Sequence, residues 1–479
     1  MRLLSFPDTV KALKSDGLLA EVDAPLSPDY EIPWLASRLA ESTVKALLFS
    51  NLQEKSFPLL TNVYYGKAQR VFKEDVDGLR ERFRRWLTLF AQFPADHASK
   101  LNKLASLAWL ADILPRIRDS AKGFLQSTSF DLDLTELPAL RHHVGEEFPV
   151  IKNPVVVFQD REAKTLEVFS QPVQVVDEKT LLIHIPHHTR AYRLIEDVAR
   201  RGGTLNVAVV VGAPPYLQLA AGINWIPWVD KYMLAGELSG SPLELMRLDN
   251  GTYVPAEAEI IITGELVPGD VRPEGKMLYE DLRLYGGSPM PVVRAKTLLY
   301  KPSALFYTSI TNPLLSDVAS LKEIEEKLLL EFIQQHIPSV IGVKYIASDA
   351  YRTMIVALDG SQSVSALEVG GLLFSINVNP YLDTVVVLKC GARCLQSMKD
   401  DSRVLTYLIS SLQHGSILAA SATPLDDVLR SERKTRIIVD ATNAAPENSI
   451  NDYIEGVKDV AKLTELYARL SRELRDAQS

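Results

Sequence analysis

The feature that most constrains the fold is a series of short apolar runs between about residues 125 and 300, in which apolar and polar residues alternate. Turn residues separate the runs. Many short strands at this spacing are typical of a sandwich or a barrel-like domain. A helix is expected to interrupt them around Arg190 to Arg200. We therefore predict a β-rich central domain over residues 123–300.

Helical and strand patterns alternate on both sides of this domain. Residues 1–122 combine a small α/β unit with two amphipathic helices expected between 76 and 122, and residues 301–445 again alternate helix and strand. In the last segment, 446–479, apolar residues at helical spacing predict a terminal helix that covers its own subunit or a second one. The predicted fold class is α/β (α+β), with three domains and a C-terminal oligomerisation helix.

Composition excludes several classes of protein. The chain has 479 residues, of which 47% are hydrophobic and 23% charged, as in ordinary globular proteins. Its formal net charge of −8 provides no overall attraction to nucleic acid. We expect a globular protein of several domains that does not bind nucleic acid.

Cysteines and apolar segments bear on the compartment. The two cysteines, Cys390 and Cys394, are too few for a disulfide framework, and they are either apolar fillers or a redox pair. The N-terminus lacks an uninterrupted apolar core of the signal-peptide type. Prolines interrupt the most apolar stretch, 207–229, which reads as a buried strand followed by a loop. These features predict a cytoplasmic protein with no membrane span.

Three short patterns could carry chemistry. His184, His187 and His188 form an H-x-x-H-H cluster, whose members are either metal ligands or solvated histidines at a strand end. The segment VGAPPY, which contains Pro214, follows an apolar strand and is either a phosphate-binding strand end or an ordinary turn.

The third pattern is PEGKMLYED, which contains Glu274, Tyr279 and Glu280. Paired carboxylates can divide proton donation and charge stabilisation between them. The alternative is an acidic loop on a solvated surface. The chain has none of the common hydrolase or kinase signatures.

Taken in order, these patterns resemble the UbiD family of decarboxylases. The segments LKSDGLLAEVDAPLSPDYEIPWLASRLAES and KALLFSNLQEKSFPLLTNVYYGKAQRV are similar to the opening of that family. The central segments IPHHTRAYRLIEDVARRGGTLNVAVVVGAPPYLQLAA, LAGELSGSPLELMRL and VPAEAEIIITGELVPGDVRPEG match in the same order. TRIIVDAT resembles the closing signature, so the likeness covers nearly the whole chain.

The resemblance implies a fold and an activity. The central domain is expected to be a split β-barrel that holds prenylated FMN, supplied by a flavin prenyltransferase. The activity would be reversible decarboxylation of an α,β-unsaturated or aromatic carboxylic acid, with protons managed by a Glu-Arg-Glu network. The cofactor phosphate would be bound through a divalent metal (manganese or magnesium) and potassium, and the protein would be a homodimer or a higher oligomer.

The two catalytic-acid positions of the family can be assigned in this sequence, with one difference. Glu274 stands at the first catalytic acid of the family, while Tyr279 occupies the place of the second and Glu280 follows it. His188 falls on the metal-binding histidine, and His187 precedes it. The resemblance thus assigns Glu274 and Glu280 as catalytic and His187, His188 and Pro214 to the cofactor site.

The remaining positions depart from the family pattern. Glu167 stands at the metal-binding asparagine, Pro172 at the catalytic arginine and Lys231 at the metal-binding glutamate. Lys231 could neutralise a phosphate, pair with Glu167 or point to solvent from a loop. A metal-free cofactor site is therefore one prediction. The first functional hypothesis is a divergent carboxy-lyase, and the alternative is a non-catalytic paralogue that acts as a partner subunit or binds a flavin or another phosphate ligand.

Overall fold

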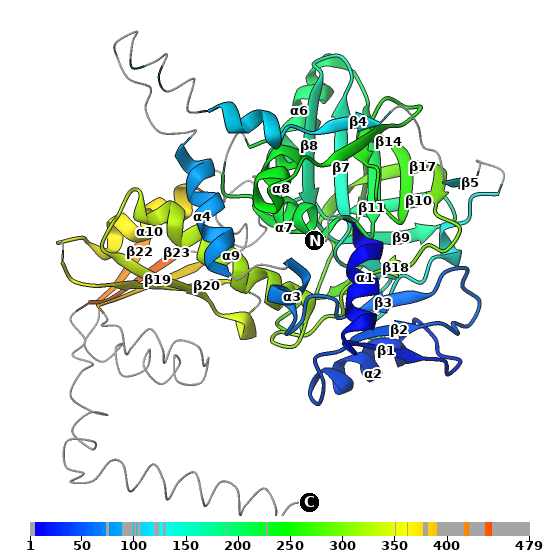
Figure 1. Ribbon diagram of the computed structural model, residues 1–479, viewed down its shortest axis with the longest axis horizontal. Coiled ribbons are helices and arrows are strands. Elements are labelled where there is room, and N and C mark those ends of the chain that lie inside the picture. The colour runs from blue at the N-terminus through cyan, green and yellow to red at the C-terminus, as the bar shows by residue number, and fades with distance from the viewer. Residues whose placement is uncertain are drawn as a thin grey trace, which may run out of the picture.

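The structure is a computed structural model, a mixed α/β fold with several sheets, which confirms the predicted fold class (Figure 1). It describes residues 5–72, 76–88, 107–118, 124–127, 131–187, 189–226, 229–349, 351–361, 363–376, 382–389, 416–420 and 436–442, together with positions 99 and 102. His188, Cys390, Cys394 and the segment 446–479 lie outside these residues. The domain boundaries at residues 122, 300 and 445 stay predictions.

The N-terminal part forms the expected small α/β unit. Its sheet has the order β1-β2-β3-β18, in which β1 and β2 are parallel. The last strand comes from far along the chain and joins this unit to the rest of the molecule. The elements are α1 (Phe6–Ser15), β1 (Leu19–Val22), α2 (Glu31–Ala40), β2 (Ala46–Phe49), β3 (Leu59–Thr61), α3 (Ala68–Phe72) and β18 (Phe306–Tyr307).

A nine-stranded sheet forms the predicted β-rich centre, in the order β6-β9-β10-β17-β14-β11-β7-β8 with β5 paired to β17. The long strands β14 and β17 run antiparallel along the middle of the sheet. A split β-barrel stays a prediction. The strands are β5 (Leu125–Ser127), β6 (Val150–Ile151), β7 (Val155–Asp160), β8 (Thr165–Ser170), β9 (Val173–Asp177), β10 (Thr180–Ile183), β11 (Leu205–Val211), β14 (Ile260–Pro273) and β17 (Pro289–Tyr300).

The region 76–122 differs partly from its prediction. Helix α4 (Val76–Leu87) forms as expected. The described residues 107–118 contain a 3-10 helix, η2 (Ala108–Asp112), and a strand, β4 (Arg116–Arg118), instead of one continuous helix. Pro115 stands between them, and the residue before a proline is disfavoured in helical conformation, so an extended segment follows.

Smaller elements connect the large ones. The strand β4 pairs with β12 in a three-stranded sheet, and β15 and β16 form a short hairpin beyond β14. The remaining elements of this region are the 3-10 helix η3 (Leu134–Glu136), β12 (Glu244–Arg247), β13 (Tyr253–Pro255), β15 (Met277–Leu278) and β16 (Leu284–Tyr285).

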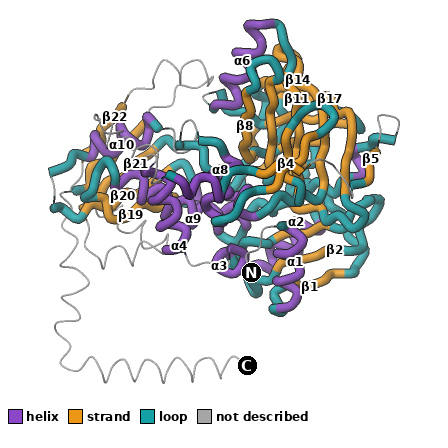
Figure 2. Tube along the Cα trace, turned by 45° about the horizontal axis from the view of Figure 1, so that its top comes forward, coloured by secondary structure: helices purple, strands orange, loops and turns teal. Residues whose placement is uncertain are grey.

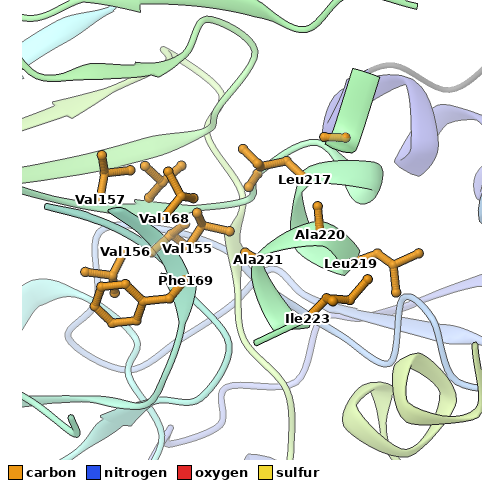
Figure 3. Close-up of a cluster of buried hydrophobic side chains, with 14 of the residues drawn as sticks. Val155, Val156, Val157, Val168, Phe169, Leu217, Leu219, Ala220, Ala221 and Ile223 are labelled. Atoms are coloured by element: carbon orange, nitrogen blue, oxygen red, sulfur yellow. The ribbon is translucent and has the colours of Figure 1, made fainter. Parts of the chain in front are cut away.

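The segment 207–229 was predicted as a strand and a loop, but a helix follows the strand. Helix α6 (Arg190–Arg201) appears as predicted, whereas α7 (Pro215–Gly222) and the next helix, α8 (Lys231–Ser239), were not predicted. Both are buried on nearly all sides, so their sequences lack the polar face that reveals an amphipathic helix. Figure 3 shows apolar side chains of α7, such as Leu217, beside Val155 and Val168 of β7 and β8.

The C-terminal part alternates helix and strand as predicted. Its five-stranded sheet has the order β19-β20-β21-β23-β22, and β20, β21 and β23 are parallel. No helix among the described residues combines the length and apolar character that a membrane crossing needs. The elements are α9 (Asp317–Gln334), β19 (Val340–Tyr345), the 3-10 helix η4 (Ala347–Asp349), β20 (Thr353–Leu358), α10 (Ala366–Ser375), β21 (Thr384–Lys389), β22 (Ser416–Ala420) and β23 (Arg436–Ala441).

Helices α4 and α9 lie side by side between the five-stranded sheet and the centre of the molecule (Figure 2). Arg84 Nε on α4 donates to Glu331 of α9 at 2.8 Å. Arg85, also on α4, reaches Glu237 of α8 with two bonds of 2.8 Å each. The first ion pair joins α4 to α9. The second joins α4 to α8, whose first residue is Lys231.

Candidate active site

Glu274 lies directly after β14, at the base of the hairpin that leads to β17. Its backbone N–H donates to the carbonyl of Ser288 at 2.8 Å, and the N–H of Gly287 donates to its carbonyl at 2.7 Å. The residue is only 5% exposed. A carboxylate so deeply buried needs a polar partner to offset the loss of its hydration.

That partner is His184, the residue after β10. Its ring Nδ1 lies 2.7 Å from Oε1 of Glu274, and the residue itself is 8% exposed. The hydroxyl of Tyr279 lies 3.3 Å from the same ring nitrogen. The backbone N–H of His184 donates to the carbonyl of Pro172 at 3.1 Å, which continues the β9–β10 ladder. The structure therefore brings Glu274, His184 and Tyr279 together.

Gln174 fixes the backbone next to the acid. Its side-chain Nε2 donates to the carbonyl of Gly275 at 2.6 Å, and its Oε1 accepts from the N–H of Gly275 at 3.1 Å. A Cβ at position 275 would approach Phe148 within 2.5 Å, so glycine is needed for this close packing. We call Glu274, His184, Tyr279 and Gln174 the Glu274 cluster.

Glu280, the second predicted acid, is half-buried, and Tyr279 is the residue of its loop that reaches His184. Glu146 holds this loop by accepting the N–H of Leu278 at 2.7 Å. Burial lowers the pKa of His142 behind the loop, and the charges of Glu146 and Glu280 oppose that change. The residue of this loop that joins the Glu274 cluster is thus Tyr279.

A second group gathers where two helices begin. Arg190 is the first residue of α6 and Lys231 the first residue of α8, and between them lies Glu167 on β8. Nη2 of Arg190 lies 3.2 Å from Oε2 of Glu167. Within the described part of the chain, the buried atoms Nζ of Lys231 and Nη1 of Arg190 have no hydrogen-bond partner. We call these three residues the Lys231 cluster.

Burial governs the charges in this cluster. Lys231 is 4% exposed, and burial lowers its pKa to about 8, although the carboxylate of Glu167 opposes the change. Burial also raises the pKa of Glu167, against the influence of Arg190 and Lys231. The alternative that Lys231 points to solvent from a loop is therefore wrong.

Neighbouring acids do not satisfy the two free donor atoms. Asp230 caps α8 by accepting the N–H groups of Tyr232 and Met233. Glu325 accepts from Nε1 of Trp225 at 3.0 Å and from Lys322 at 2.6 Å. The cluster therefore offers unpaired cationic donors at two helix N-termini, an arrangement that suits an anion such as a phosphate.

The same donor set does not suit a divalent metal ion. An ammonium group cannot ligate such an ion while it is protonated. Among the described residues, no group of three or more histidine, cysteine, aspartate and glutamate side chains is placed to hold a metal. Glu167 pairs with Arg190, and its charge acts on the buried Lys231.

The other predicted cofactor residues are His187, in the chain between His184 and α6, and Pro214, before α7. His187 is half-buried and stacks on Tyr192, with ring centroids 4.4 Å apart. Pro214 is buried and precedes the first turn of α7. His184 and Arg190 are six positions apart in the chain, so their Cα atoms lie within about 20 Å of each other. His188 lies outside the described residues.

Comparison with known families identifies the chain. The family model of the 3-octaprenyl-4-hydroxybenzoate carboxy-lyase Rift-related domain (UbiD) matches residues 117–313. The model of the N-terminal domain of the same carboxy-lyase (UbiD_N) matches residues 10–82. The chain belongs to the UbiD family. The resemblance stated from the sequence is confirmed, and the Glu274 and Lys231 clusters both lie within the matched UbiD segment.

Relatives and solved structures agree with this assignment. An uncharacterized protein of Aquifex aeolicus (strain VF5) is 27% identical over 72% of both chains, and one of Synechocystis sp. is 21% identical over 93% of this chain and 91% of the relative. An evolved dimeric form of the UbiD-class enzyme HmfF from Pelotomaculum thermopropionicum, in complex with prFMN, has a TM-score of 0.74 at 20% identity and covers 96% of this chain and 98% of its own.

A second solved structure has the same fold. Vanillic acid decarboxylase from Sedimentibacter hydroxybenzoicus, in its closed form, has a TM-score of 0.74 at 18% identity. The match covers 97% of this chain and 99% of that enzyme. These likenesses extend the UbiD fold over nearly the whole chain.

Sequence reasoning did not single out Gln174 or Arg190. It named His184 only as a member of a histidine cluster and not as a partner of Glu274. Gln174 lies two residues after Pro172 on a strand, where alternation places both side chains on one face. That spacing could have indicated a polar partner for the loop, whereas the contact of His184 with Glu274 joins residues 90 positions apart.

Proposed function

We propose that this UbiD-family chain is a decarboxylase that acts on an α,β-unsaturated or aromatic carboxylic acid with prenylated FMN as cofactor. The observation that carries the proposal is the buried carboxyl of Glu274, which lies 2.7 Å from Nδ1 of His184. Gln174 holds the next residue, Gly275, by donating to its carbonyl. A pre-oriented, water-shielded carboxyl suits proton transfer to a carbon atom. The resemblance stated from the sequence assigns the same residue to the catalytic-acid position of the family.

The residues of the Glu274 cluster have distinct roles in this proposal. When bound, prenylated FMN supplies an electron sink for the electron pair released as CO₂ leaves. Glu274 donates its proton to the carbon atom that has lost CO₂. Gln174 holds the backbone at Gly275 and thereby the direction of the carboxyl group. Glu280 stays a candidate for a second carboxylate, since it lies on the loop that also carries Tyr279.

The Lys231 cluster would hold the phosphate of the flavin. Nζ of Lys231 and Nη1 of Arg190 are buried donors without partners among the described residues, and both are at helix N-termini that favour an anion. Glu167 orients Arg190 through their ion pair. His187 lies in the chain between His184 and Arg190, Pro214 precedes α7, and we propose that both contact the cofactor.

We further propose that the phosphate is bound without a divalent metal ion. The ammonium group of Lys231 would repel such an ion and would attract a phosphate dianion. Protein purified with its cofactor and dialysed against a chelator should therefore retain little manganese or magnesium in elemental analysis. Stoichiometric retained metal would contradict this proposal.

Production together with a flavin prenyltransferase tests the cofactor and the activity. We expect a coloured protein whose extracted cofactor has the mass of prenylated FMN. Cinnamic, benzoic and furoic acids and their hydroxylated derivatives would then be screened for CO₂ release, and for exchange of labelled CO₂ in the reverse direction.

A Glu274→Gln variant that binds the same cofactor is the matched control, because any CO₂ release that it retains is not due to this acid. Cofactor-loaded protein that neither releases CO₂ nor exchanges it with any acid would contradict the proposed activity. A protein that never takes up the flavin would instead support a non-catalytic paralogue.

A further inference from the structure

Pro172 provides no side-chain hydrogen-bond donor to the Glu274 cluster. The family resemblance places an arginine there, and proline has neither a side-chain donor nor a backbone N–H. The carbonyl of Pro172 accepts the N–H of His184 at 3.1 Å, so the residue beside it on the neighbouring strand is a histidine. His184, directly after β10, thus provides a basic side chain, whereas Pro172, directly before β9, does not.

The histidine ring is aimed at the acid. Its Nδ1 lies 2.7 Å from Oε1 of Glu274, and the two residues are only 8% and 5% exposed. An imidazole N–H so close to a buried carboxylate stabilises the charge that appears when the acid loses its proton. Tyr279 also contacts the histidine, with its hydroxyl 3.3 Å from the same nitrogen and the two ring centroids 5.9 Å apart.

We propose that His184 is the positioning residue of Glu274 and supplies the hydrogen-bond donor that the missing arginine would otherwise provide. The proposal rests on the role given to Glu274 above. When Glu274 transfers its proton, its O–H bond breaks and the C–H bond of the product forms. Glu274 is then a carboxylate. The Nδ1–H of His184 then donates to that carboxylate until a solvent proton restores the acid.

The donor at Nδ1 can be tested with a matched pair of variants. Asparagine places its Nδ2 near the position of histidine Nδ1, whereas alanine removes the donor. In cofactor-loaded protein with an acid from the screen above, we expect His184→Ala to lower kcat by roughly 10- to 100-fold with little change in KM. His184→Asn should recover most of the loss. Equal losses in both variants, or a change in KM alone, would overturn the proposal.

A second measurement needs neither cofactor nor substrate. The chain has eight histidines, so ring ¹³C signals can be assigned by single substitutions. We expect the ring ¹³C signals of His184 to shift in Glu274→Gln relative to wild type, because the substitution changes the group that lies 2.7 Å from Nδ1. Glu147→Gln, an exposed change beside the same hairpin, should leave these signals unchanged.

The two measurements separate this inference from the proposed function. A coupled His184–Glu274 pair in a protein without decarboxylase activity would retain the inference about the pair while the proposed activity fails. An active decarboxylase in which Glu274→Gln leaves the ring signals of His184 unchanged would retain the activity and overturn the role of His184. Melting temperatures of all variants would show that each one is folded.

Discussion

Glu274 and Lys231 are buried ionisable residues, and burial alone would disfavour the charged form of each. Their surroundings differ. Glu274 already has a polar partner in His184, whereas Nζ of Lys231 has no hydrogen-bond partner among the described residues. A buried group that lacks a partner in the protein is poised for a ligand, and a satisfied one is oriented for chemistry. This contrast separates the proposed acid from the proposed phosphate site.

The role of Glu274 leads to the first prediction. Glu274→Gln keeps the size of the side chain and a hydrogen-bond acceptor for His184 but removes the transferable proton. We expect cofactor binding to be retained and turnover to fall by about 100-fold or more. Steady-state CO₂ release per bound cofactor measures the effect. Turnover equal to wild type would end the catalytic role of Glu274, and Glu147→Gln should behave as wild type.

The second prediction concerns the pH dependence of stability. Burial lowers the pKa of Lys231 from 10.5 to about 8 in the folded protein. Below pH 8 the lysine is charged in both states and the full cost of burying the charge is present; as pH rises from 8 towards 10.5 that cost is relieved. Lys231→Met should therefore raise the melting temperature of cofactor-free protein at pH 7, with a smaller gain at pH 9.5.

Calorimetry at both pH values provides the measurement, with Lys11→Met on the exposed face of α1 as the control. Addition of FMN should reverse the order. A phosphate that pairs with Lys231 stabilises wild type by mass action and stabilises Lys231→Met less. If FMN raised the melting temperature of both proteins equally, Lys231 would not contact the phosphate.

At the scale of elements, helix α4 holds the helix that carries Lys231. Glu237 of α8 is fully buried, and its charge is matched by the two bonds from Arg85 of α4. A Cβ at Gly236 would lie 2.5 Å from the carbonyl oxygen of Ile113, so α8 also lies in close contact with the chain after η2. The position of Lys231 therefore depends on residues far from it in the sequence.

Removal of Arg85 should expose this dependence. Arg85→Met leaves the carboxylate of Glu237 buried and unpaired, and we expect the free energy of unfolding to fall by roughly 3 kcal/mol. Arg85→Met combined with Glu237→Met should recover part of that loss. Denaturant unfolding measures both. The exposed pair of Arg38 and Glu41 is the control, since Arg38→Met should cost less than about 1 kcal/mol. Equal costs at the two sites would refute a stabilising role for the α4–α8 pair.

At the scale of the whole molecule, the segment 446–479 bears on assembly. Its apolar residues Ile454, Val457, Val460 and Leu463 recur at helical spacing, and a helix with such a stripe needs a surface to cover. We expect a chain without residues 447–479 to elute from size-exclusion chromatography as a smaller species, or to become insoluble. An unchanged elution volume would place the helix on its own subunit.

The sequence by itself determined the α/β class, most elements of the C-terminal part and the family, because periodicity and ordered motifs are local properties of the chain. The positions of Glu167, Lys231 and Glu274 in the family pattern stay predictions from the resemblance. The sequence did not predict α7 and α8 as helices. Nearly all of their residues are buried, polar ones included, so the apolar period that reveals a surface helix is missing.

Only the tertiary structure decided which charged groups are partners. The contact of His184 with Glu274 and that of Arg190 with Glu167 join different strands and helices, and spacing along the chain does not encode such contacts. Burial was decided at the same level: the sequence left open whether Lys231 points to solvent, and only the packing of α8 against its neighbours removes it from water. A side chain's charge is a property of the residue, but its partner and its hydration are properties of the fold.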